Sequence, residues 1–528
     1  MSIENGIIPG INVSQQVHGR FETIGNAVVK KARTFTLDVE KTARQYPHQE
    51  LLLAPPLKSM NKTMNLAVVL LLSCSVLQAA EWKYAWKIPS AQPALSATVC
   101  PFLYGKNWGY AFEIDDGPVE VRTFTAGFFA QYQWNDAPPG VSGGRDHPIV
   151  GSVAVIGCAV DANSTLLSWD QIKELIGMGW GVANHSYYHL GHTWGDPPRL
   201  LSREELREDL FWSQAIIGRK TGLGRAPTHL VYPNGYPAYS DYFEEFGLRS
   251  GSLICGPGGR NFSDPKFDLK MIDRTFMDEG NWNTWMKSEP MAGFPEDGDP
   301  VPADQFILDF THSISSDPQT PNYQRWQKRM ETIVSRYGKA GSNDFWNAPA
   351  EQIINYKLAA EKAEVHVDGN GITVRLPDNI PGSALTLQIN NVPPNAVLAP
   401  PDGGVLYQKG STVWLTSPVI GKPGAPLPDP SIKCIFKGPA GEYAFEKPEK
   451  LAGVLVKHFG QGEELLVKAE VEGPDGKTET MATYTLPNAW ANGTILLPAL
   501  PNKPAPLVKK VTVTKDKRIN EMEVWVVE

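Results

Sequence analysis

The sequence predicts an α/β fold of barrel-like layers, followed by C-terminal all-β modules that resemble a β-sandwich. Two observations lead to this prediction. Between residues 100 and 363, short apolar runs rich in β-branched and aromatic residues alternate with segments of helical spacing, which is typical of an α/β layer structure. After residue 363 the helical spacing disappears, and short alternating runs separated by Pro- and Gly-rich turns replace it.

The predicted strands of the first part end at polar residues. Residues 108–114 alternate apolar with polar or small residues and run into Asp115 and Asp116 before a Gly-Pro turn. Residues 180–183 lead in the same way into Asn184 and His185. Because α/β enzymes carry their chemistry where strands end, these two places are candidate parts of one site.

The predicted helices have recognisable starts. Ser168 is the N-cap of a helix over 168–176, and the residues from Ser202 to Glu205 form a capping box that opens a helix to about residue 217. Two further helices are predicted over 323–337 and 348–361, and a helix followed by an insertion over the active-site face is predicted within 120–150.

The pair His185-x-x-x-His189 can present two imidazoles on the same side of one turn. With a carboxylate from elsewhere in the fold, the pair would hold a divalent metal and leave positions open for water and substrate. Taken alone, such a pair is more typical of surface or helix-capping histidines, and an Asp-Asp-Gly sequence is more typical of a solvated turn. The strand ends that precede both motifs favour the metal site.

Five motifs in order then resemble the polysaccharide deacetylases of carbohydrate esterase family four. They are Asp-Asp-Gly at 115–117, Asn-His-Ser-x-x-His at 184–189, Tyr-Pro-x-Gly at 232–235, Arg274 and Thr-His at 311–312. The resemblance covers about residues 100–363. It implies a distorted (β/α) barrel of about seven strands for that region.

The resemblance implies a role for each of these residues. Asp115 matches the general base that deprotonates the metal-bound water, and Asp116 matches the ligating acid, with His185 and His189 as the other two ligands. Two imidazoles and one carboxylate suit Zn²⁺, while Co²⁺, Ni²⁺ and Mn²⁺ are compatible. Such an ion brings bound water towards a pKa of about 7 and polarises the acetyl carbonyl.

The later motifs are looser. For the Tyr-Pro-x-Gly motif, the resemblance implies that the backbone N–H of Asn234 faces the oxyanion. It also implies that Tyr232 and Pro233 shape the acetyl pocket. This sequence departs from the commoner Arg-Pro-Pro-Tyr form and so lacks its arginine. Arg274 resembles the arginine that Tyr-Pro members carry after a later strand, where it orients the base Asp115. Standing alone, these motifs would be a β-turn and a surface cation.

His312 follows the apolar run 306–310. The family carries Leu-x-His there, and its His donates a proton to the leaving amine; Phe310 replaces the Leu in this chain. An isolated His after a strand is more often structural, but the preceding motifs favour the catalytic acid. His192, close to His189, is predicted to be a structural residue.

The expected function is that of a hydrolase that removes N- or O-linked acetyl groups from an extracellular or cell-wall polysaccharide. The alternative is a non-catalytic glycan-binding or cell-surface protein that retains the barrel. The net charge is -8 and there is no basic tract, so nothing suggests nucleic acid and we expect no nucleic-acid partner. The glycan, the kind of acetyl linkage and the oligomeric state stay open.

The N-terminal region predicts export. Lys58 and Lys62 precede the apolar run 66–72, and small residues follow, so residues 60–80 have the pattern of a secretory signal peptide. The protein is therefore expected to be secreted or in the bacterial periplasm or cell envelope, with the membrane as a partner only through this segment. Cys74 lies in a sequence that resembles a lipobox, which leaves a lipid anchor open.

Residues 1–59 precede this signal and are expected to be a non-native upstream extension, or disordered. Met60 or Met64 would then serve as the start, and the alternative is a long cytoplasmic extension that holds an uncleaved anchor. Beyond the barrel we expect a small β module over 364–420, a linker over 421–428 and a β-sandwich accessory domain over 428–528. The sandwich either binds carbohydrate or acts as a spacer. The scattered cysteines indicate no disulfide framework, and one bridge from Cys100 stays open.

Overall fold

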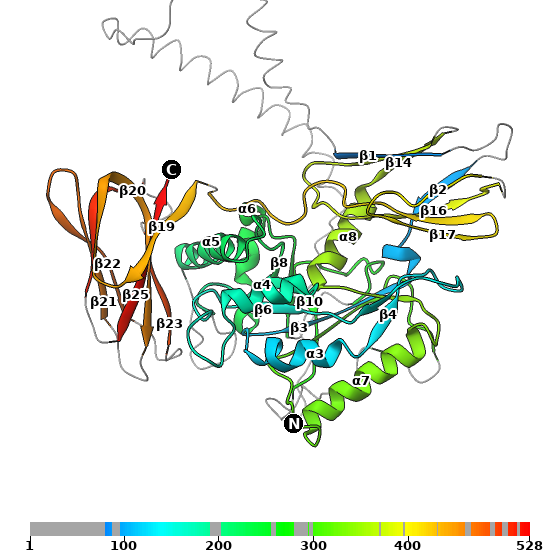
Figure 1. Cartoon of the computed structure of the whole chain (residues 1–528), viewed down its shortest axis with the longest axis horizontal. Coiled ribbons are helices and arrows are strands. Elements are labelled where there is room, and N and C mark those ends of the chain that lie inside the picture. The colour runs from blue at the N-terminus through cyan, green and yellow to red at the C-terminus, as the bar shows by residue number, and fades with distance from the viewer. Residues whose placement is uncertain are drawn as a thin grey trace, which may run out of the picture. The chain divides into compact units, whose positions relative to one another are not determined.

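The computed structural model describes residues 80–86, 95–190, 202–254, 260–278, 294, 299–368, 371–393, 396–429, 431–459, 466–485, 492–498, 505–514 and 518–528 (Figure 1). The predictions for residues 1–59, for the signal peptide except Ala80, and for Cys74 and His192 lie outside these residues. Among the described residues, no helix is long and apolar enough to cross a membrane.

A parallel sheet forms the centre of the first part. Its neighbouring strands pair in the order β10-β9-β8-β7-β6-β3-β12-β11, and every pairing is parallel. The strands are β3 (Trp108–Ile114), β6 (Ser152–Val155), β7 (Gly181–Asn184), β8 (His229–Val231), β9 (Ser250–Leu253), β10 (Ile272–Asp273), β11 (Thr275–Phe276) and β12 (Phe306–Thr311), with β13 (Phe345–Asn347) added beside β3.

The sheet closes on itself at Arg274. This residue separates β10 from β11, and β10 pairs with β9 while β11 pairs with β12. The two edge strands of the sheet, β10 and β11, are therefore consecutive parts of one short segment, which closes the sheet into a ring. The ring consists of β3, β6, β7, β8, β9, the β10–β11 segment and β12, which confirms the prediction of a distorted barrel of about seven strands.

Helices follow the strands and cover the barrel (Figure 1). Ser168 is the N-cap of α4 and Ser202 forms the capping box of α5, as predicted, and each accepts the backbone N–H of the residue three positions on. Ser168 also forms a capping box, with Gln171, which was not predicted from the sequence. The helices are η1 (Leu103–Gly105), η2 (Val121–Thr125), α3 (Ala126–Phe129), α4 (Trp169–Gly177), α5 (Arg203–Lys220), η3 (Pro233–Gly235), η4 (Pro237–Tyr242), α6 (Phe243–Phe246), α7 (Pro321–Tyr337) and α8 (Ala350–Lys362). The insertion after α3 is a hairpin of β4 (Gln133–Asn135) and β5 (Asp146–Pro148).

Strands that precede the barrel complete the sheets that follow it. β1 (Ala80–Ala85) pairs with β15 (Gly371–Leu376), whose other neighbour is β14 (Glu364–Asp368). β2 (Ser96–Val99) pairs with β16 (Thr386–Asn390) in a sheet that continues through β18 (Thr412–Thr416) and β17 (Val405–Lys409). Leu387 and Leu415 of this sheet belong to the same buried cluster as Phe112 in the barrel. The region predicted as a module over 364–420 thus shares a core with the barrel, and its sheets include β1 and β2.

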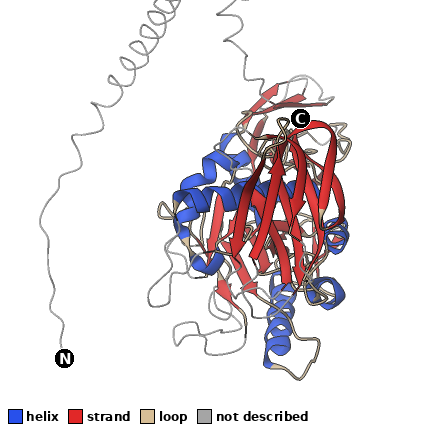
Figure 2. Ribbon diagram, turned by 90° about the vertical axis from the view of Figure 1, so that its left-hand side faces the viewer, coloured by secondary structure: helices blue, strands red, loops and turns tan. Residues whose placement is uncertain are grey.

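The segment predicted as a linker over 421–428 lies against the barrel part, because Ala226 and Ala425 exchange two backbone hydrogen bonds of 2.9 Å. Beyond it, an antiparallel sheet of seven strands surrounds a second apolar core (Figure 2). Its strands are β19 (Ile432–Pro439), β20 (Glu442–Phe459), β21 (Leu466–Glu472), β22 (Thr478–Thr485), β23 (Asn492–Pro498), β24 (Leu507–Val513) and β25 (Ile519–Val527). The long β20 pairs with β24 along its first half and with β25 and β23 along its second, which gives the predicted sandwich-like arrangement.

Candidate active site

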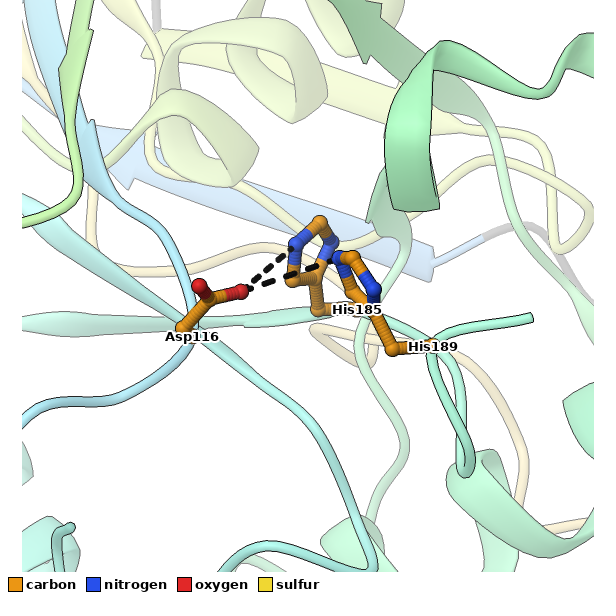
Figure 3. A group of neighbouring side chains, drawn as sticks. All are labelled: Asp116, His185 and His189. Atoms are coloured by element: carbon orange, nitrogen blue, oxygen red, sulfur yellow. Dashed lines mark ion pairs between the residues drawn. The ribbon is translucent and has the colours of Figure 1, made fainter. Parts of the chain in front are cut away.

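The structure brings Asp116, His185 and His189 together at the ends of β3 and β7 (Figure 3). Nε2 of His185 lies 3.4 Å from Oδ1 of Asp116, and Nε2 of His189 lies 3.7 Å from the same oxygen. One ligand atom of each residue falls within 4.8 Å of the others. The spacing leaves room for an ion between them.

The donor set fits a divalent cation. Nδ1 of His185 is 2.7 Å from the carbonyl oxygen of Val231, so this nitrogen donates its proton and the lone pair of Nε2 points at Asp116. Oδ1 of Asp116 is buried and accepts no well-aligned hydrogen bond from any described residue. A buried oxygen facing two imidazole nitrogens is the arrangement that a metal ion would complete.

The electrostatics of Asp116 point the same way. Burial opposes its ionisation, but the neighbouring side chains of His185, His189 and His312 outweigh that cost and hold the pKa of this carboxyl well below its usual range. Asp116 also has a φ of 68°, a left-handed conformation that costs energy in a residue other than glycine. The turn thus directs an ionised carboxylate at the two histidines.

Asp115, beside the metal cluster, is held by Arg274. Nη1 and Nη2 of Arg274 donate to Oδ1 and Oδ2 of Asp115 at 2.9 and 3.0 Å, a bidentate pair. The guanidinium also donates to Glu113 Oε2 at 3.1 Å and lies 3.9 Å from the centre of the Phe310 ring. Because Arg274 occupies the closure of the barrel, the fold itself places the arginine behind the predicted base.

Sequence reasoning missed the residues behind this arginine. Glu113, the second-last residue of β3, faces His229 with Oε1 and Nε2 2.7 Å apart, and its Oε2 accepts from Ser252 Oγ at 2.8 Å. Burial opposes ionisation of Glu113, but His229, Arg274 and Ser252 lower its pKa to about 2. In the sequence, the signal for Glu113 is an acidic residue within an otherwise apolar run. The structure shows that every residue of this strand is buried.

His312 follows β12 and pairs with Asp278, a residue that no sequence motif indicated. Its Nδ1 lies 2.5 Å from Oδ2 of Asp278, and its backbone N–H donates to the same carboxylate. Burial lowers the pKa of His312, but Asp278 and then Asp115 and Asp116 raise it to about 9. The imidazole is therefore protonated near neutral pH. Together with Asp116 and Asp278 it lines an open cavity whose other residues are Ser313, Ser315, Thr320 and Asn322.

The Tyr-Pro-Asn-Gly turn lies next to the metal cluster. Asn234 has a φ of 49°, and its Nδ2 is 3.4 Å from Nδ1 of His189. Tyr232 and Pro233 are buried, and the Tyr232 hydroxyl donates to the carbonyl oxygen of Lys270 at 2.8 Å. Tyr232 is consequently a buried wall residue whose hydroxyl is already engaged.

Comparison with family models gives one match, which covers part of the barrel. Residues 114–249 match the family model described as polysaccharide deacetylase. The matched segment contains the strand ends that carry Asp115, Asp116, His185 and His189 and the turn at Asn234. The family resemblance drawn from the motifs is therefore confirmed for this segment.

Solved structures give more distant matches. A Streptococcus pyogenes deacetylase in complex with acetate is 14% identical, with 28% of this chain and 56% of that chain covered and a TM-score of 0.22. A Bacillus cereus polysaccharide deacetylase is 18% identical, with 30% and 44% covered and a TM-score of 0.22. The matches thus span about half the length of those structures. No curated protein matches the sequence.

Proposed function

We propose that this protein is a metal-dependent hydrolase that removes acetyl groups from an extracellular or cell-wall polysaccharide. The observation that carries the proposal is that three groups of side chains lie together in one site. These are the cluster of Asp116, His185 and His189, the carboxylate of Asp115 clamped by Arg274, and the protonated His312 in the adjoining cavity. The family match over 114–249 supports it.

Asp116, His185 and His189 would hold the metal, for which Zn²⁺ is our choice among the divalent ions that suit nitrogen and oxygen ligands. When bound, the ion supplies Lewis acidity towards the acetyl carbonyl and lowers the pKa of water. The carboxylate of Asp116, whose buried Oδ1 faces both imidazoles, would supply the negative charge among the three ligands.

The remaining steps fall to the side chains around the cluster. Asp115 accepts a proton from the attacking water, and the bidentate hydrogen bonds from Arg274 fix the orientation of its carboxylate. As the bond from the acetyl carbon to the sugar nitrogen or oxygen breaks, His312 donates the proton that the leaving atom needs. Since Nδ1 of His312 faces Asp278, Nε2 is the nitrogen that donates. Acetate and a free amine or hydroxyl are the products.

The turn at Asn234 completes the proposed site. Its backbone N–H is our candidate donor to the oxyanion, because the left-handed turn places Asn234 beside His189. Tyr232 and Pro233, both buried, support that turn from behind. We further propose that the protein acts outside the cytoplasm, since the apolar run 66–72 and its basic flank have the composition of an export signal.

The test is acetate release by the metal-loaded protein from chitooligosaccharides, peptidoglycan glycan strands, poly-N-acetylglucosamine and acetylated xylan. Asp115→Asn keeps the shape but removes the base, so we expect loss of acetate release with metal content unchanged. Asp170→Asn is the matched control, because Asp170 is an exposed carboxylate paired with Lys173 on α4. Its activity should equal that of the wild type.

Two results would overturn the proposal. If Asp115→Asn retains wild-type activity, Asp115 is not the base. If the metal-loaded wild type releases acetate from none of these glycans but binds one of them, the retained barrel serves glycan binding instead.

A further inference from the structure

The backbone that carries both histidines of the metal cluster is strained. Within residues 184–189, Ser186 has a φ of 63° and His189 a φ of 54°. Neither residue is glycine, and a left-handed conformation strains the backbone of a residue that carries a side chain. Such a loop keeps its shape only if surrounding groups determine it.

Those groups can be identified by following the amide hydrogens of the loop. His185 N–H donates to the carbonyl oxygen of Val155, Ser186 N–H to Oδ1 of Asn184, and His189 N–H to Oγ of Ser186. These three bonds stay within the loop or reach the neighbouring strand. The two amides between the histidines remain, and they depend on a more distant residue.

That residue is Asp209 on α5. Its Oδ1 accepts from the N–H groups of Tyr187 at 3.2 Å and Tyr188 at 2.8 Å, and its Oδ2 accepts from the Tyr239 hydroxyl at 2.7 Å. Asp209 is 3% exposed and Tyr239 is fully buried. A buried carboxylate is retained only where donors compensate its desolvation, and most of its donors here come from the histidine loop and from η4.

Packing restricts the loop on the same side. Tyr187 is fully buried in a cluster with Trp212 of α5, and Tyr239 belongs to η4, which directly follows the Tyr-Pro-Asn-Gly turn. Asp209 therefore joins the segment that carries the two histidines to the segment that carries Asn234. One carboxylate links the metal cluster with the proposed oxyanion donor.

We propose that Asp209 is a positioning residue that holds His185 and His189 in the geometry that binds the metal. The inference rests on the proposed function for the identity of the metal ligands. Removal of the carboxylate takes away the oxygen that accepts the N–H groups of Tyr187 and Tyr188. The loop then relaxes out of its left-handed turns to hydrate them, and the two imidazoles separate.

The test compares metal affinity across variants of the full chain stripped of metal with a chelator. Co²⁺ is titrated in and followed by its visible absorption spectrum, and Zn²⁺ affinity is measured by competition. We expect Asp209→Ala to weaken Co²⁺ binding by about 10- to 100-fold and to change the spectrum. Asp209→Asn keeps an acceptor for the two amides, so it should stay within a few fold of the wild type.

Glu351→Ala is the matched control for lost stability. Glu351 is also a buried helix carboxylate, and its Oε1 accepts the backbone N–H and the hydroxyl of Thr228, each at 3.0 Å. This variant should melt at a lower temperature but bind Co²⁺ with wild-type affinity. If Asp209→Ala does not fold, Tyr239→Phe removes one bond to the same carboxylate and should weaken Co²⁺ binding by a smaller factor.

Folded Asp209→Ala with wild-type Co²⁺ affinity and spectrum would overturn the inference, as would an equal loss of affinity in Glu351→Ala. In the unfolded case, Tyr239→Phe with unchanged affinity would do so. The readout needs no substrate. A wild type that binds Co²⁺ but deacetylates no glycan would therefore contradict the proposed reaction alone and leave the role of Asp209 standing.

Discussion

Replacement of Arg274 by methionine should destabilise the barrel strongly. Three hydrogen bonds of 2.9 to 3.1 Å from this guanidinium end on carboxylate oxygens, two of Asp115 and one of Glu113, and the arginine side chain has no exposed surface. Glu113 would retain His229 and Ser252, so most of the loss falls on Asp115. Removing one partner of a buried charge pair costs about 3 to 5 kcal/mol, and we expect a loss in that range.

The assay is urea denaturation of the metal-free chain, followed by tryptophan fluorescence. Arg375→Met is the control, since the pair of Arg375 with Glu81 is exposed and its loss should cost about 1 kcal/mol or less. The double variant Arg274→Met/Asp115→Asn removes the orphaned charge together with the arginine. It should recover part of the lost stability.

The outcome that would refute this reasoning is equal stability of Arg274→Met and Arg375→Met. A double variant less stable than Arg274→Met would also refute it, because an uncompensated Asp115 would then not be the source of the loss. Deacetylation by Arg274→Met should fall at least about 100-fold, since the base loses the bidentate contact that orients it.

Two further predictions concern Lys106 and Asp278. Burial lowers the pKa of the Lys106 ammonium from 10.5 to about 7, so between these values the unfolded chain binds more protons than the folded chain, and stability should rise with pH by up to about 1.4 kcal/mol per unit. Lys106→Met should remove this rise. If the free energy of unfolding changed with pH in the same way for the wild type and the variant between about pH 7.5 and 9.5, the expectation would be contradicted. Asp278→Asn removes the carboxylate that raises the pKa of His312, so less of this imidazole is protonated and N-deacetylation should slow by about 100-fold. Hydrolysis of 4-nitrophenyl acetate should hardly change, because its leaving group needs no proton. Equal losses on both substrates would exclude this role.

Much of the barrel follows from the sequence because its signals are local. Strand β3 ends at Ile114, where the alternating run meets Asp115, and α4 and α5 begin directly after Ser168 and Ser202, whose side chains accept the expected amides. Strands β1 and β2 could not be assigned in the same way. Their partners β15 and β16 lie far away in the sequence, and no local pattern encodes that pairing.

The same difference between local and long-range signals applies to the candidate site. Asp115, Asp116, His185 and His189 lie in short motifs with their own spacing, and the structure brings the three predicted ligands together. Asp278 and Asp209 act through contacts across the fold, with His312 and with the loop of Tyr188, and nothing near them in sequence marks those partners. Their contacts depend on which segments the fold brings together.

The most direct test of the central proposal is a metal titration of chelator-treated protein, with acetate release from an N-acetylated glycan measured at each step. We predict no release by the metal-free protein, a linear rise with added Zn²⁺ and saturation at about one ion per chain, with His185→Ala/His189→Ala inactive throughout. Full activity in the metal-free protein, or in that double variant, would contradict a hydrolytic metal centre at Asp116, His185 and His189.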